Sequence, residues 1–169
     1  MIPRYSRKVM TEIWEEKNRF NIWINIEVAA LEAMEELEIV PRGTASKVNK
    51  KANFDINRIN EIEKEIKHDV LAFLTNLSEN VGPESRFIHQ GMTSSDVIDT
   101  CLNIQLKEAG NILLNGIDNL LEALKRKAIE HKNTVCIGRS HGIHAEPTTF
   151  GLKMLQAYEE FQRNKKRLN

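Results

Sequence analysis

Apolar residues recur every three or four positions along most of the chain, a period that is typical of amphipathic helices. The first stripe predicts one long helix that ends near Leu37, because Pro41 and Gly43 follow as stop signals. Its members are Ile13, Phe20, Trp23, Ile24, Leu31 and Met34. The pattern as a whole predicts an all-α fold.

Two shorter helices are predicted after this first one. Asp55 is a good N-cap for a helix that carries the isoleucines following it, and Asp69 is expected to cap a further short helix that closes before Gly82. Segment 84–92 has no amphipathic period, so we expect an ordered loop there.

The longest helix is predicted to open at Thr93–Asp96, where a hydroxyl is followed three residues later by an acid. If it runs to about His131, it is roughly 55 Å long at ~1.5 Å per residue. Its apolar stripe comprises Leu102, Leu106, Ala109, Leu113, Ile117, Leu120 and Leu124. A stripe of this length on one helix predicts partner helices, either from other subunits or from a monomeric bundle; other subunits are the favoured source.

The last part of the chain changes character. Residues 134–137, three of them β-branched, are predicted to be extended, and Gly138–His144 is expected to form a polar turn. Pro147 suits the first position of a final helix. That helix has no stop signal before Asn169, so the sequence is expected to be cut within it.

Composition narrows the class of protein. The 24 basic and 24 acidic residues balance, which argues against a nucleic-acid partner. The two cysteines, Cys101 and Cys136, suggest a reducing compartment rather than a disulfide framework. Residues 1–10 lack the apolar core of a signal peptide, and no apolar run is long enough to span a bilayer. We therefore expect a cytoplasmic protein with no membrane partner.

Four of the five histidines lie outside the helical pattern: His68, His89, His141 and His144. Histidine is the side chain whose pKa best suits proton transfer near neutral pH. His141 follows Ser140 in a glycine-containing turn, His68 precedes Asp69 at a helix start, and His89 precedes the long helix. By position alone, each of these three is as consistent with a structural role as with a functional one. His131, at a helix end, is expected to be structural.

Thr93 and Ser94 carry a different signal. A helix amino terminus presents unpaired N–H groups, and two hydroxyls add donors, which together suit a carboxylate or phosphate. Simple capping is the alternative. The His and Cys spacings match no zinc site, and neither a GxGxxG nor a Walker loop is present, so no metal or cofactor is expected.

Several motifs resemble the adenylosuccinate lyase family, within the fumarase/aspartase superfamily. They are Met1–Ser6, Lys67–Val70, His89–Asp96 and Gly138–Gly151. They run through the whole chain in the order and spacing of that family. The resemblance implies a small helical amino-terminal domain, residues 1–92, that leads into the first long helices of a central helical bundle, residues 93–169. It also implies a homotetramer that needs no metal or organic cofactor.

The resemblance implies a β-elimination that releases fumarate from adenylosuccinate to give AMP, and from the succinylated carboxamide ribonucleotide (SAICAR) to give AICAR. It makes His141 the general acid and His68 its partner or support in proton transfer, with the division between them open. The expected substrate-binding residues are Arg4 and Tyr5 at the phosphate, Lys67, Asp69 and His89 along the substrate, Ser140, and Thr93 and Ser94 at a succinyl carboxylate.

The chain departs from the family pattern in two respects. Ser140 stands where many members have threonine, which keeps the hydroxyl. The family's base, a serine on a downstream glycine-rich loop, is absent, so we expect this chain to be inactive alone. The alternatives are another fumarate-releasing lyase, such as argininosuccinate lyase, and a non-enzymatic helical interaction module.

Overall fold

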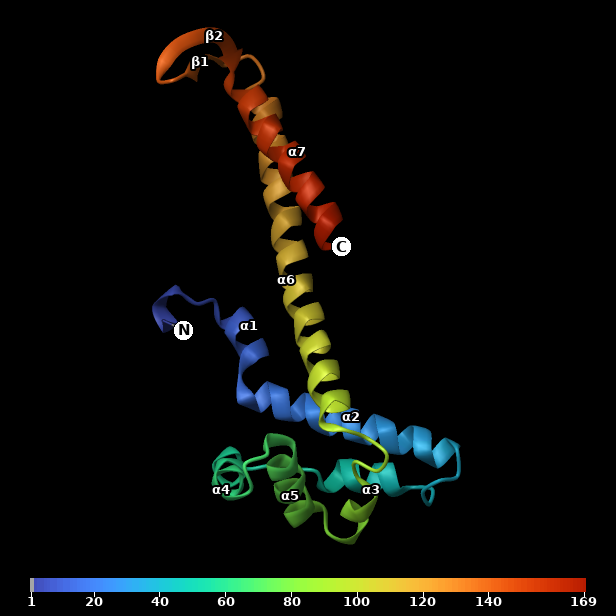
Figure 1. Cartoon of the computed structure of the whole chain (residues 1–169). Coiled ribbons are helices and arrows are strands. Elements are labelled where there is room, and N and C mark those ends of the chain that lie inside the picture. The colour runs from blue at the N-terminus through green and yellow to red at the C-terminus, as the bar shows by residue number, and fades with distance from the viewer. Residues whose placement is uncertain (1) are drawn as a thin grey trace. The chain divides into compact units, whose positions relative to one another are not determined.

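The computed structural model describes residues 2–169, and helices dominate it (Figure 1). Two compact units divide within the longest helix: one extends to Glu108, and the other is Ala109–Asn169. The prediction of an all-α fold is confirmed, with one two-stranded hairpin added to it. The expected domain boundary between residues 92 and 93 stays a prediction.

The first unit consists of short helices around one long helix. In chain order they are η1 (Pro3–Tyr5), α1 (Lys8–Thr11), η2 (Glu12–Trp14), α2 (Glu16–Glu36), α3 (Thr44–Lys51), α4 (Ile56–Ile66), α5 (Asp69–Val81), η3 (Pro83–Phe87) and the beginning of α6 (Ser94–Glu130). The predicted first helix is thus confirmed as α2, although Ile13 lies before it in η2. The expected loop at 84–92 begins with the 3₁₀ turn η3.

A cluster of three aromatic side chains lies within the otherwise mostly aliphatic core of the first unit. Phe20 and Trp23 of α2 pack against Phe73 of α5, with ring centroids 5.2–5.5 Å apart, and all three are buried. Edge-to-face and offset aromatic pairs add to the free energy gained from burying their area. This cluster packs together two helices that are far apart in sequence, and so helps to position the loops around residues 67 and 89.

Asp55 caps α4 as predicted: its Oδ1 accepts from the backbone N–H groups of Asn57 and Arg58 at 2.8 and 3.3 Å. The prediction that Asp69 caps α5 is wrong. The N-cap is His68, whose Nδ1 accepts from the N–H of Leu71 at 3.3 Å, and Asp69 is the first helical residue. An acid in the first turn still interacts favourably with the helix dipole.

In the second unit, α6 continues to Glu130 and is followed by a hairpin of β1 (Val135–Ser140) and β2 (Ile143–Thr149) and by α7 (Phe150–Leu168). α7 runs back along the carboxyl-terminal part of α6 (Figure 1), and Lys165 of α7 forms an ion pair with Asp118 of α6. The predicted long helix and the predicted extended segment at 134–137 are both confirmed.

The prediction that Pro147 starts the last helix is wrong, because Pro147 lies in β2 opposite Ile137. Proline is accepted there since both strands of a two-stranded sheet are edges, and the pairing register shifts next to it, between Ile137 and Arg139. α7 starts at Phe150, with Thr149 as its N-cap. The expected polar turn over 138–144 is likewise mostly strand.

Candidate active site

Three predicted site residues follow one another where α4 ends and α5 begins. Lys67 ends α4 in the left-handed conformation, with φ at 56°, and is exposed. His68 caps α5, and Asp69 Oδ1 lies 3.7 Å from His68 Nδ1. Because Nδ1 accepts the N–H of Leu71, the neutral ring carries its proton on Nε2. That nitrogen is the one that points away from the cap.

His68 meets the amino terminus of α6. Its Nε2 lies 3.4 Å from Ser94 Oγ, across 26 positions of sequence. The backbone N–H of Thr93 is taken by the Asp96 carboxylate at 2.8 Å, which is half of a capping box. The N–H of Asp96 donates to the carbonyl of Thr93 at 3.0 Å; in general, the first N–H groups of a helix have no partner one turn earlier and can bind an external acceptor. A hydroxyl, an imidazole and a helix amino terminus therefore converge at one point, a combination that suits an anionic group.

His89 lies in the turn before α6 and contacts α2. Its Nδ1 is 2.6 Å from Oε1 of Glu27, and its backbone N–H donates to Oε2 of the same carboxylate at 2.9 Å. Glu27 is only 1% exposed, whereas the His89 side chain keeps 17% of its surface exposed. The ring is thus held on one side by a buried carboxylate.

His141 and Ser140 lie in the second unit, at the tip of the hairpin. His141 and Gly142 both have positive φ, 52° and 74°, and connect the paired residues Ser140 and Ile143. Two central residues with positive φ are the signature of the type I′ turn that matches hairpin twist. Ser140, His141 and Gly142 are exposed, and within the described part of the chain no hydrogen bond to the His141 ring is formed.

The other candidates are more peripheral. Arg4 and Tyr5 form η1, where the guanidinium of Arg4 lies 4.7 Å from the centroid of the Tyr5 ring, and both side chains are exposed. His144 is exposed in β2, opposite Arg139. His131 packs on the ring of Phe150, centroid to centroid 5.2 Å, which agrees with a structural role.

Residues 4–169 match a protein family described simply as lyase. The chain belongs to this lyase family. Two similar relatives are adenylosuccinate lyases: that of Bacillus subtilis (strain 168) is 49% identical over 99% of this chain and 39% of its own length, and that of Aquifex aeolicus (strain VF5) is 48% identical over 99% and 39%. The resemblance to adenylosuccinate lyase is confirmed, and the chain spans about 39% of the length of these relatives.

A solved structure gives the same picture of the fold. The crystal structure of a fumarate lyase from Mesorhizobium sp. BNC1 matches with a TM-score of 0.89 and 26% identity, covering 94% of this chain and 38% of that one. The helical fold of this chain therefore also occurs as part of a longer chain, that of this fumarate lyase.

Three of the predicted site residues share an unusual backbone conformation. Lys67, His89 and His141 have positive φ without being glycine, and Glu38 is the other described residue of this kind. Such conformations cost of order 1–3 kcal/mol each and persist where the surroundings hold them. At His89 the restraint is visible, because Glu27 binds both its backbone and its ring.

Glu27 is the site residue that the sequence reasoning missed. Its signal was present: it lies four residues after Trp23 and four before Leu31, on the apolar face of α2. An acid in that position is buried and must find a partner, and the partner is His89.

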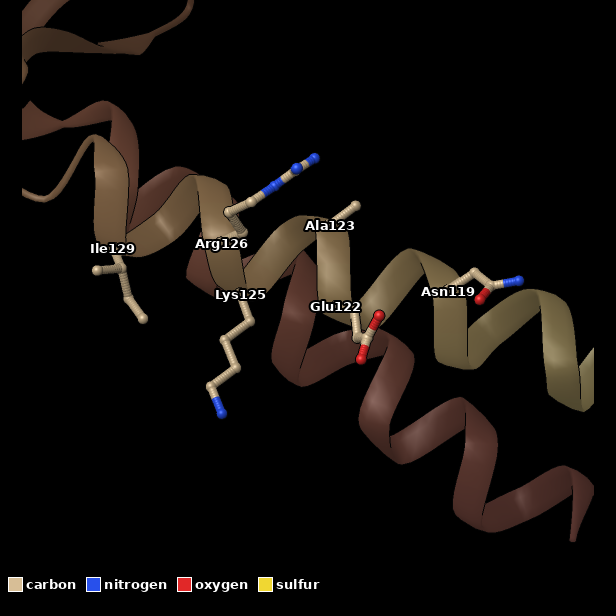
Figure 2. A pocket seen from close by; sticks show the side chains of 6 residues that line it. All are labelled: Asn119, Glu122, Ala123, Lys125, Arg126 and Ile129. Atoms are coloured by element: carbon tan, nitrogen blue, oxygen red, sulfur yellow. The ribbon is translucent and has the colours of Figure 1, made fainter.

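A hollow of about 540 Å³ lies elsewhere, on the α6 surface of the second unit (Figure 2). All the side chains that line it come from α6: Asn119, Glu122, Ala123, Lys125, Arg126 and Ile129. It contains none of the predicted site residues. Within residues 2–169, no group of three His, Cys, Asp or Glu side chains is placed to hold a metal ion.

Proposed function

We propose that this chain is the amino-terminal part of an adenylosuccinate lyase, which cleaves adenylosuccinate to AMP and fumarate and SAICAR to AICAR and fumarate. The 49% identity to the Bacillus subtilis adenylosuccinate lyase, over 99% of this chain, supports the assignment of adenylosuccinate as substrate. The main structural support for the proposed active site is the approach of His68 to Ser94 at the amino terminus of α6. The chain alone is expected to be inactive.

The chemistry explains the need for such a site. A base removes a proton from the carbon beside a carboxylate of the succinyl group, and the negative charge spreads onto that carboxylate. The electron pair then forms the double bond of fumarate, while the C–N bond breaks and its electrons pass to the nitrogen. Donors already in place for the charged carboxylate lower the barrier, often by the largest single contribution. Thr93 and Ser94 are proposed to be those donors.

The proposed roles of the remaining residues follow the family pattern. His141 protonates the leaving nitrogen, a transfer that typically contributes ~10²–10⁴-fold to the rate. His68 supports that proton transfer, and His89 orients the substrate. Lys67, Asp69 and Ser140 line the substrate site, while Arg4 and Tyr5 bind the phosphate. The base is supplied by a part of the enzyme outside this chain.

The partners are proposed to be a small nucleotide substrate and other copies of the chain, with neither nucleic acid nor membrane and without a cofactor. Within the described residues, no helix is both long and apolar enough to cross a membrane. Large side chains on α6 support assembly as a homotetramer, because Leu102, Leu106 and Leu113 are 45–52% exposed. Cytoplasmic location is proposed since Cys101 and Cys136 are free thiols.

A chimera tests this proposal. Residues 1–169 are joined to the remainder of the Bacillus subtilis adenylosuccinate lyase, and fumarate release from adenylosuccinate is followed by absorbance. We expect an active chimera, an inactive 169-residue chain, and a loss of ~10²–10⁴-fold in kcat for His141→Ala in the chimera. His144→Ala, on the same strand pair, is the matched control and should retain activity.

Three outcomes would count against the proposal. A folded chimera that cleaves argininosuccinate instead of adenylosuccinate would overturn the assigned substrate. Full activity of the His141→Ala chimera would show that His141 is not the general acid. Activity of the 169-residue chain alone would show that the base lies within it.

A further inference from the structure

The pair formed by Glu27 and His89 joins two segments 62 positions apart. Both carboxylate oxygens of Glu27 are used by this one residue, Oε1 at 2.6 Å from the ring and Oε2 at 2.9 Å from the backbone N–H. Glu27 is 1% exposed and lies in the middle of α2, whose other buried residues are all apolar. A carboxylate buried at this depth requires donors on both oxygens.

This geometry decides where the proton of the neutral His89 ring resides. An ionised carboxylate only accepts hydrogen bonds, so the nitrogen 2.6 Å from it, Nδ1, must donate. In the neutral ring, Nε2 then carries the lone pair. No group in the described part of the chain hydrogen-bonds Nε2, and the side chain is 17% exposed. Nε2 is thus the ring atom left for a ligand.

From these contacts we propose that Glu27 is a positioning residue for His89. It fixes the ring in the Nδ1–H tautomer and holds the left-handed backbone at φ 63°, so that Nε2 is the atom offered to the substrate. The orienting role of His89 rests on the proposed function; the tautomer and its cause do not.

His68 provides an internal contrast. Its Nδ1 accepts a backbone N–H, so its neutral ring carries the proton on Nε2, opposite to the state inferred for His89. Two histidines of the same unit are therefore held in opposite tautomers by different partners, a backbone donor in one case and a carboxylate acceptor in the other. In an NMR spectrum of the ring nitrogens, the signals of His68 can therefore serve as a reference for those of His89.

The test uses the 169-residue chain with ¹⁵N-labelled histidine. Ring nitrogen shifts and their couplings to the carbon-bound protons identify the tautomer, measured at a pH where the rings are neutral. The His89 signals are those missing from the His89→Asn variant. In the unmodified chain we expect Nδ1 to be protonated in His89 and Nε2 to be protonated in His68.

Glu27→Gln is the decisive variant. An amide has one accepting oxygen and one donating NH₂, so the oxygen takes the His89 backbone N–H and the NH₂ faces Nδ1. Nδ1 must then accept, and the tautomer should switch to Nε2–H. Glu32→Gln, on an exposed position of the same helix, is the matched control and should leave the His89 tautomer unchanged.

An Nε2–H tautomer of His89 in the unmodified chain would overturn the proposal, and so would an unchanged tautomer in a folded Glu27→Gln variant. If Glu27→Gln does not fold, the unmodified chain still decides, because its tautomer alone can contradict the inference. Neither measurement needs lyase activity, so failure of this proposal is distinct from failure of the proposed function.

Discussion

At the scale of single residues, Glu35 shows how one carboxylate organises a helix that does not contain it. α3 follows Gly43, which has no side chain to act as a cap. Glu35, in α2, accepts instead from the backbone N–H groups of Ala45 at 2.5 Å and Gly43 at 3.0 Å. These hydrogen bonds, with that to Ala45 the strongest influence, lower the pKa of the Glu35 carboxyl below its ordinary value.

The lowered pKa predicts how Glu35 contributes to stability as the pH changes. Because the folded pKa is lower than the unfolded one, the contribution is fully present above about pH 4.5 and is lost as the pH falls through the folded pKa. Glu35→Gln should lower the Tm at pH 7, and the difference from the unmodified chain should shrink in acid. Thermal unfolding between pH 7 and pH 3 checks this. Glu36→Gln, exposed on the same helix, is the control; a Glu35→Gln difference independent of pH would contradict the argument.

Residues of this kind mark the limit of reasoning from sequence. Asp55 was predicted as a cap because its acceptor lies next to the N–H groups that it serves. Glu35 and Glu27 serve groups that are 10 and 62 positions away, so their roles depend on how α2 packs. A local sequence pattern can therefore predict a contact between neighbouring residues, such as the Asp55 cap, but not a contact between distant segments. His68 and Ser94 could each be proposed individually, but their approach required the fold.

At the scale of elements, the junction between α6 and α7 is set by one glycine. The N–H of Gly151 donates to the carbonyl of His131 at 2.9 Å, which brings the start of α7 against the end of α6. A Cβ at this position would lie 2.7 Å from the backbone of Lys132 and would also meet the carbonyl of Ala128. Pro147 suits the first turn of a helix by its local conformation, but its pairing with Ile137 in the hairpin overrides that preference.

Gly151→Ala should therefore destabilise the second unit. The new methyl group meets backbone atoms, which cannot rotate away, so we expect a loss of about 1–3 kcal/mol in the free energy of unfolding. Urea unfolding followed by circular dichroism measures it. Gly116→Ala is the matched control: it lies within α6 with no atom within 4 Å of its Cβ, and should stabilise by roughly 0.5–1 kcal/mol. Equal effects of the two substitutions would refute the close approach.

At the scale of the whole molecule, the sequence predicted the succession of helices well, because long amphipathic stripes determine α2 and α6 largely by themselves. It also predicted that the α6 stripe would need partners. In the second unit, Leu113 and Leu120 are seven residues apart and are 50% and 37% exposed. Positions seven apart lie on one face of a helix, so the second unit exposes an apolar strip along α6.

This strip predicts self-association of the 169-residue chain. Burying a leucine side chain is worth about 1.5–3 kcal/mol, so placing a charge there in Leu113→Glu should raise the dissociation constant by at least about tenfold. Sedimentation equilibrium over a range of concentrations measures the change. Asn111→Glu adds the same charge two residues earlier, about 160° away around the helix, and should leave association unchanged. If the unmodified chain is monomeric at every concentration, or if both variants weaken it equally, the strip along α6 is not the surface through which copies of the chain meet.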